Sequence, residues 1–414
     1  MSTSHSKRLI VLDVARAIGM FLVCTNHFVN VYYSPYPSLS ADPNPPFVMI
    51  VNAICRVASP LFVLTSGLVL GYISTARIKD FSRLRLHFLD RAIFLATIGH
   101  LLIALAFTPQ VGFYNALGFG YMTDTLAFCT IAGLLLVPFM SALSTRLWFG
   151  VIVYLMGWVG WYLWHPDHSM LITLRSIFLG PDDEGGMIFY DPILPWFGVY
   201  LIGTCIGGWL STIRRDNLRL AGKTLAIRSA IVMSFVISIA LPIFLLVKFG
   251  FIEIPPYLLA LGKKYPPGIS YLLIFGSASL FLIGGLLFFE LDSKTGVFKG
   301  VLTRLGRNSF PTFVIQYFIY YAALFLLVTQ ISKPTLLVAV VLYISSLLVI
   351  VLLGFGFDRF GVNRFWTVGL PALVRRWPVL YGAGWQPSSR MPSNLGPLAL
   401  QFIDRLKWNA AGRN

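Results

Sequence analysis

The first apolar run of the sequence carries an arginine and a histidine that could act on one substrate. Residues 9–33 are long enough to cross a bilayer, which takes about 20 residues, yet they contain Arg16 and His27. Eleven positions at about 100° each bring two side chains to nearly the same face of a helix. An imidazole can remove or deliver a proton near neutral pH, as acyl transfer to a hydroxyl or amine requires. The residue type makes His27 a candidate for proton transfer, and the spacing places Arg16 on nearly the same face.

Three more polar residues lie on or near this face. Asp13 precedes Arg16 by three positions, Asn26 adjoins His27, and Asn30 follows it by three. A charged side chain inside hydrocarbon costs at least about 2.5–3.5 kcal/mol, so the polar face is expected to point toward a site. Two simpler interpretations stay open. Asp13 could only pair with Arg16 at i,i+3, and His27 could be a buried histidine bonded to Asn26, Asn30 or another helix.

Depth along the helix separates the arginine from the histidine. At 1.5 Å per residue, Arg16 and His27 lie about 16 Å apart along the axis. They cannot share one proton, but they could hold opposite ends of a long substrate.

Basic residues elsewhere offer further candidates. Arg56 falls near the middle of the second apolar run, where a lone arginine needs a partner or a water-filled cavity. Arg83 and Arg85 belong to the basic segment 77–91, which could attract the phosphates of a cofactor at the inner surface. The same segment could equally serve only as a topology signal that contacts anionic lipid.

Other titratable residues are weaker candidates. His100, Asp124 and Glu290 lie within or at the ends of apolar runs. Residues 165–168 (HPDH) and the acidic residues 182–184 could suggest metal ligands, but their spacing fixes no coordination geometry. The sequence therefore predicts no metal site.

The composition is that of a polytopic membrane protein. Hydrophobic residues make up 57% of the 414 and charged residues only 12%, against about 25% charged in soluble domains. The net charge of +16 comes from basic residues in short loops between apolar runs, which favours membrane topology over nucleic-acid binding. All four cysteines fall inside apolar runs, so neither a disulfide framework nor a zinc cluster is expected. The first run is too long for a cleavable signal.

The apolar runs predict an all-α fold, a bundle of about ten transmembrane helices. They are approximately 9–33, 47–73, 90–108, 121–143, 147–164, 193–211, 229–250, 268–290, 309–330 and 335–357. The termini and the loops after even-numbered runs hold 25 Lys and Arg residues, and the opposite loops hold 4. The positive-inside rule then places both termini in the cytoplasm of a plasma or inner membrane. We expect a membrane domain over 1–357 and a basic, partly mobile cytoplasmic tail over 358–414.

Five segments in order resemble the acyltransferase-three superfamily of integral membrane acyltransferases, and two of them resemble its heparan-α-glucosaminide N-acetyltransferase-like branch. The segments are RLIVLDVARAIGMFLVCTNHF (8–28), SPLFVLTSGLVLGY (59–72), YDPILPWFGVYLIGTCIGG (190–208), KKYPPGISYLLIFG (263–276) and LGRNSFPTFVIQY (305–317). The first has the family's hallmark, an arginine followed after ten residues by a histidine.

The resemblance implies an enzyme that takes an acyl group from cytoplasmic acyl-CoA, often acetyl-CoA, and transfers it to a sugar or glycan. His27 is similar to the family's catalytic residue and Arg16 to its essential partner, while Asn308 and Ser309 belong to its LGRNS element. Two positions depart from the usual pattern. Ala17 replaces a glycine, and Gln316 stands where many members have a histidine.

Two other functions compete with this interpretation. A transporter, or a translocase for lipid-linked glycans, would also use an intramembrane Asp, Arg and His, although no matched pair of broken helices is visible in the sequence. A membrane scaffold with a degenerate site is the third, because of Gln316.

Overall fold

The computed structural model describes residues 9–33, 46–76, 81–181, 191–253, 262–289, 297–330 and 335–360. Throughout these ranges the secondary structure is helical, with no strand. Ten stretches within them are long and apolar enough to cross a membrane. The predicted all-α fold with about ten spans is therefore confirmed.

The ten stretches combine the longer helices and the short π or 3₁₀ segments between them. In chain order they are formed by α1 (Ile10–Tyr33); α2 (Pro46–Cys55) with α3 (Ala58–Ala76); α4 (Phe81–Phe94), η1 (Leu95–Gly99) and α5 (His100–Val111); α7 (Met122–Leu136) with η2 (Val137–Phe139); α8 (Leu143–Leu163); α10 (Ile193–Thr212); α11 (Leu218–Lys248); α13 (Ile269–Tyr271), η5 (Leu272–Gly276) and α14 (Ser277–Phe288); α16 (Ser309–Tyr317), η6 (Phe318–Leu324) and α17 (Phe325–Val328); and α18 (Leu336–Arg359). The shorter helices are α6 (Phe113–Gly118), α9 (Ser169–Phe178), η3 (Arg215–Asn217) and α15 (Val297–Arg307).

Two features differ from the sequence expectation. Helix α11 begins at Leu218 rather than near 229, because basic residues mark where a chain leaves the hydrocarbon and do not end its helix. The connection between α8 and α10 contains α9, a short apolar helix that the apolar runs did not predict. Of the expected tail 358–414, residues 361–414 lie outside the described ranges. Three other expectations also fall outside them, namely those on residues 77–80 of the basic segment, on the acidic residues 182–184 and on Glu290.

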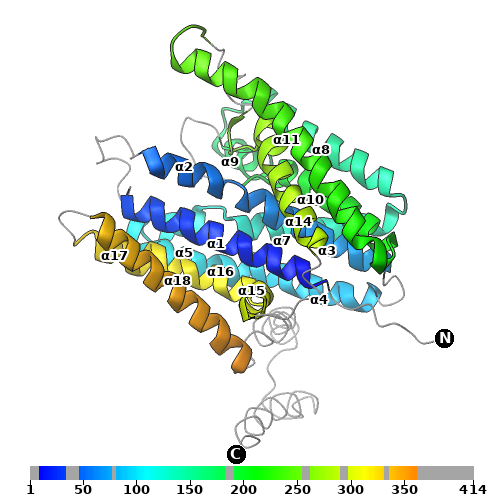
Figure 1. Ribbon diagram of the computed structural model, residues 1–414. Coiled ribbons are helices and arrows are strands. Elements are labelled where there is room, and N and C mark those ends of the chain that lie inside the picture. Colours follow the sequence, from blue (N-terminus) through cyan, green and yellow to red (C-terminus); the bar gives the residue numbers. More distant parts are fainter. Residues whose placement is uncertain are drawn as a thin grey trace, which may run out of the picture.

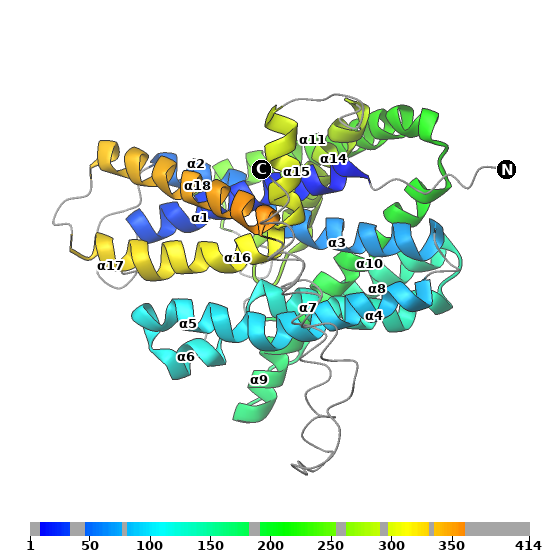
Figure 2. The same ribbon diagram turned by 90° about the horizontal axis from the view of Figure 1, so that it is seen from below.

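Helix α1 lies inside the bundle, where it contacts α2, α3, α15, α16 and α18 (Figure 1). Helices α11 and α18 lie along opposite edges in Figure 1, and in Figure 2 both lie along the upper side, apart from each other. In the most apolar window of α10, 72% of residues are buried, against 0% for α11 and 11% for α18. The helices with apolar outer faces are therefore the ones that meet lipid, and α1 and α10 form the interior.

Helices α3 and α10 approach each other at backbone contact. Gly67 and Gly71 on α3, and Gly203 and Gly207 on α10, are each spaced by four residues. A Cβ added to Gly71 would lie 2.0 Å from the Thr204 carbonyl oxygen, and one added to Gly207 would lie 2.0 Å from that of Leu68. Small residues at this spacing allow close helix packing in membranes, where apolar burial alone gives no preference for protein over lipid.

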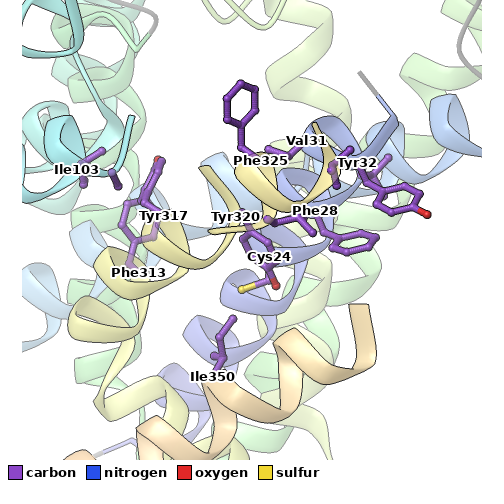
Figure 3. Packing of buried hydrophobic residues seen from close by; sticks show 14 of the residues in the cluster. Cys24, Phe28, Val31, Tyr32, Ile103, Phe313, Tyr317, Tyr320, Phe325 and Ile350 are labelled. Carbon is purple, nitrogen blue, oxygen red and sulfur yellow. The ribbon is translucent and has the colours of Figure 1, made fainter. Parts of the chain in front are cut away.

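An aromatic cluster fixes α16 and η6 against α1. Cys24, Phe28 and Tyr32 of α1 belong to one buried cluster with Tyr317 and Tyr320 (Figure 3). Figure 3 shows the side chains of Cys24 and Tyr320 close together between α1 and η6. This packing sets the register between the two helical segments and so determines which residue of α16 meets His27.

Candidate active site

His27 faces protein on α1 and is held by a side chain of α16. Its Nδ1 lies 2.7 Å from Oε1 of Gln316. A carboxamide oxygen only accepts hydrogen bonds, so Nδ1 carries the proton and Nε2 keeps a free lone pair. An imidazole in this tautomer is prepared to accept a proton at Nε2.

Tyrosine rings enclose the imidazole. The rings of Tyr317 and Tyr321 each lie 5.0 Å from the His27 ring, centroid to centroid. Phe107 of α5 stacks on Tyr321 at 4.2 Å. His27 itself is half-buried. A site of low polarity strengthens electrostatic interactions made within it, so a proton transfer here would be sensitive to the partner of Nδ1.

Gln316 is fully buried, and half of its carboxamide is unused. Its Nε2 has no hydrogen-bond partner among the described residues. Buried donors without partners are rare in folded proteins. This N–H group lies next to the imidazole and could donate a hydrogen bond to an oxygen atom of a bound ligand.

Arg16 lies about three helical turns from His27 along α1, where it pairs with Asp13. The Nη1 of Arg16 is 3.7 Å from Oδ1 of Asp13, and the arginine side chain is 22% exposed while the aspartate is 2% exposed. Arg16 also interacts electrostatically with Tyr200 of α10. A Cβ at Gly306 of α15 would lie 1.7 Å from the Asp13 carbonyl oxygen, so the backbones of α15 and α1 are in direct contact next to Asp13.

The two asparagines expected near His27 belong to a separate network. Asn26 donates to Asn52 of α2 (3.0 Å), Asn52 donates to Asn30 (3.1 Å), and Asn30 donates to Asn26 (3.3 Å). Each amide thus gives and accepts one hydrogen bond in a closed ring of three. This ring joins α1 to α2, and the contact that orients His27 comes from Gln316 instead.

The remaining predicted binding residues lie away from the imidazole. Arg56 is exposed between α2 and α3, and its carbonyl accepts a hydrogen bond from Tyr271 (3.0 Å). Arg85 is exposed on α4, and the side chain of Arg83 is outside the described residues. Asn308 is buried and donates to the Gly354 carbonyl (3.2 Å), which ties the start of α16 to α18. Ser309 is half-buried in the first turn of α16.

His100 and Asp124 form a buried clamp. His100 Nδ1 lies 2.9 Å from Asp124 Oδ2, and its Nε2 lies 3.1 Å from the Leu117 carbonyl. The same carboxylate oxygen accepts from the backbone N–H of Tyr121 at 2.9 Å. Since both ring nitrogens face acceptors, His100 acts here as a double donor. The clamp joins α5, α6 and α7.

The histidines of the HPDH segment have local partners. His165 Nε2 bonds the Tyr162 carbonyl at 2.9 Å, and His168 Nδ1 accepts from the Met170 backbone N–H as the N-cap of α9. No group of three or more metal-ligating side chains occurs in the described ranges.

Three residues with potential functions were given no role by the sequence analysis. These are Asp191, Trp196 and Lys264: Asp191 interacts with both Trp196 and Lys264, and Lys264 also interacts electrostatically with His27. An aspartate directly before a proline at the start of an otherwise apolar helix was the available signal.

Helix irregularities adjoin the site. The π segment η1 ends just before His100, η5 begins just after Tyr271, and η6 begins just after Tyr317. Such segments are frequent at functional sites because they redirect side chains that a regular helix would turn away. In η6 the wider turn accompanies the placement of Tyr321 beside His27.

Comparison with family models resolves the class of the protein. The model described as an acyltransferase domain, acyltransferase-3, matches residues 9–355. The chain belongs to the acyltransferase-3 family. No curated protein and no solved structure matched it. Membership supports a multi-pass membrane acyltransferase and agrees with the ten spans. Its place in the heparan-α-glucosaminide N-acetyltransferase-like branch stays a prediction.

Proposed function

We propose that this acyltransferase-3 protein moves an acyl group, with acetyl-CoA as the expected donor, from cytoplasmic acyl-CoA to a hydroxyl or amine of a sugar or glycan. The observation that carries the proposal is the hydrogen bond from His27 Nδ1 to Gln316 inside a tyrosine-lined interior. It leaves Nε2 as the base, on a helix that also carries Arg16.

His27 acts first as a base and then as an acid. Its Nε2 takes the proton of the acceptor hydroxyl or amine while that oxygen or nitrogen attacks the thioester carbonyl. When the tetrahedral intermediate collapses, the carbon–sulfur bond breaks and the imidazolium returns the proton to the departing thiolate. General base catalysis of this kind is typically worth about 10²–10⁴-fold in rate.

Gln316 has two functions in this scheme. Its Oε1 holds the tautomer of His27 and stabilises the imidazolium that forms. Its Nε2, which has no partner in the described part of the chain, is the donor that we assign to the oxyanion. Preorganised donors of this kind contribute strongly because they need no reorganisation during the reaction.

Arg16 holds the other end of the donor. The separation of about 16 Å along α1 suits a long thioester that enters from the cytoplasm, with its phosphates near Arg16 and the basic loops. Asp13 keeps the guanidinium in place through their ion pair.

The test uses purified protein in nanodiscs with labelled acetyl-CoA and a panel of glycans. His27→Ala should abolish acyl transfer, with a loss of at least about 100-fold, while the protein still inserts and runs as one species. His168→Ala, which changes an exposed N-cap histidine, is the matched control and should keep its activity. Near-wild-type transfer by His27→Ala would remove His27 from the mechanism. Glycan flux into proteoliposomes without any acyl donor would instead support the transporter hypothesis.

A further inference from the structure

Asp191 is an acidic side chain buried just outside the membrane-spanning part of α10. It is 8% exposed and directly precedes Pro192, the N-cap of that helix. Its backbone carbonyl accepts a hydrogen bond from Thr125 of α7. Its Oδ1, however, has no hydrogen-bond partner in the described ranges. Burial raises the pKa of Asp191 to about 6, so the group is still largely ionised at neutral pH. A buried carboxylate without its full set of partners costs free energy, which suggests that a ligand completes it.

Trp196 supplies a donor at the same place. Its side chain is fully buried, and its indole N–H has no hydrogen-bond partner among the residues that the structure describes. The indole N–H lies close enough to the Asp191 carboxylate to lower the pKa of that group, but the contact does not reach the distance and angle of a hydrogen bond. One unpartnered acceptor and one unpartnered donor therefore share a small region. A hydroxyl group can satisfy both because one oxygen donates and accepts.

The surroundings suit an uncharged ligand with several hydroxyls. Lys264 interacts electrostatically with Asp191 and Tyr271, and its ammonium stacks on the Tyr265 ring at 4.7 Å. An ammonium ligand would meet repulsion from Lys264 and leave the Trp196 N–H without an acceptor. An anionic ligand would meet repulsion from Asp191. A neutral polyhydroxylated group avoids both penalties.

This region is joined to the imidazole through one aromatic ring. Tyr317 interacts electrostatically with Asp191, and its ring lies 5.0 Å from that of His27. Lys264 likewise interacts with both Asp191 and His27. A ligand anchored at Asp191 would therefore extend toward the base.

From this geometry we infer that Asp191, Trp196 and Lys264 form a subsite that anchors a hydroxyl of a neutral saccharide acceptor. The inference deepens the proposed function and rests on it for the role of His27. Saccharide binding itself needs neither an acyl donor nor a competent base.

The experiment measures saccharide binding without catalysis. Glucose, galactose, mannose and N-acetylglucosamine, with their short oligomers, are titrated at up to millimolar concentrations against wild type and His27→Ala. Binding is read from the shift of the thermal unfolding midpoint and from equilibrium dialysis with labelled sugar. We expect at least one saccharide to bind both proteins. Asp191→Asn and Trp196→Phe should each weaken that binding by about 10- to 100-fold, since each removes one hydrogen bond.

Two matched controls separate the subsite from general effects. Trp158→Phe removes another indole N–H that lacks a partner, on α8, and Asp167→Asn removes an exposed outward carboxylate. Both should leave saccharide affinity unchanged. Size-exclusion profiles establish that each variant is folded.

The outcomes for the subsite and for the proposed function differ. No binding by any saccharide, or unchanged affinity in both Asp191→Asn and Trp196→Phe, would overturn the subsite, and a water molecule would then be the sole occupant. Saccharide binding that depends on Asp191, in a protein that transfers no acyl group, would reject the enzyme proposal and retain the subsite. Acyl transfer to a saccharide with an unchanged acceptor KM in Asp191→Asn would retain the enzyme proposal and reject the subsite.

Discussion

At the scale of single residues, the hydrogen bond between His27 and Gln316 leads to a kinetic prediction. Gln316→Leu removes the acceptor of Nδ1–H but leaves an apolar side chain of similar size. It also removes the Nε2–H donor that we assign to the oxyanion. A hydrogen bond to a group that becomes charged contributes about 1.5–3 kcal/mol, and loss of one oxyanion donor costs about 10²–10³ in kcat. The kcat should therefore fall by at least about 100-fold, with little change in the KM for acyl-CoA. Gln316→His, the residue of many family members, should retain most of the activity. Equal kcat in Gln316→Leu and wild type would show that the contact does not position the base.

Gln316→Glu tests the same contact by a different readout. An ionised carboxylate at this position would stabilise the imidazolium, so His27 would stay protonated to higher pH. The rise of kcat with pH should therefore shift upward relative to wild type. A purely structural role for position 316 would lower the amplitude of the pH profile without moving it.

The buried carboxylate of Asp191 predicts a pH-dependent stability. Burial raises its pKa from 3.8 to about 6, with Lys264 and the Trp196 indole opposing this rise and Asp124 adding to it. The folded protein then binds the proton more tightly than the unfolded chain, so this group destabilises above about pH 6 and the penalty disappears as the pH falls toward 4. Asp191→Asn should raise the thermal unfolding midpoint at about pH 7.5 and lose this advantage at about pH 4.5.

The control for this measurement is Asp167→Asn, whose exposed carboxylate should show no such pH-dependent gain. A midpoint for Asp191→Asn that is lower than wild type at neutral pH would mean that Asp191 stabilises the fold. Higher stability together with weaker saccharide binding would show a residue kept for function at the expense of stability.

At the scale of the helices, the glycine contacts of α3 and α10 carry a packing prediction. Gly207→Ala would place a Cβ 2.0 Å from the Leu68 carbonyl oxygen, so the two backbones must separate. Overpacking typically costs about 1–3 kcal/mol, and we expect a lower thermal midpoint with loss of monodisperse protein. Gly285→Ala is the control, because a Cβ on that glycine of α14 would meet nothing within 4 Å. Equal midpoints for the two variants would contradict a close α3–α10 contact.

The polar face of α1 is divided between different partners. The asparagines use α2, His27 uses α16, and Arg16 uses Asp13 and the region of α10. Helical periodicity placed these side chains on related faces, but it could not assign a partner, since that depends on which neighbouring helix covers each turn. The Asn52 and Gln316 partners lie 22–26 and 289 positions away in sequence, respectively.

At the scale of the whole molecule, the distribution of basic residues predicts the orientation in the membrane. Arg214 before α11 and Glu253 after it are both exposed, and they should face opposite sides. In intact cells, a membrane-impermeant maleimide should label Glu253→Cys directly and Arg214→Cys only after permeabilisation. The wild type gives the background, because its cysteines are buried or half-buried. The opposite labelling pattern would place both termini outside.

The sequence by itself determined the fold class, the number of spans and the residue types of the candidate site. These follow from the length of apolar runs, from helical periodicity and from the cost of charge in hydrocarbon, all of which act locally. The ten spans are confirmed, and His27 faces protein as the polar stripe predicted.

Only the tertiary structure decided which groups meet. In the sequence, Gln316 is a departure from a family motif. In the structure it is the hydrogen-bond partner of His27. In the sequence, Asp191 and Trp196 only mark the start of an apolar helix. In the structure each has a buried polar atom with no hydrogen-bond partner among the described residues. The register of α16 on α1 and the close approach of α3 to α10 come from aromatic packing and glycine contacts between distant segments. Such contacts depend on the shapes of two surfaces at once, which no local pattern in one segment specifies.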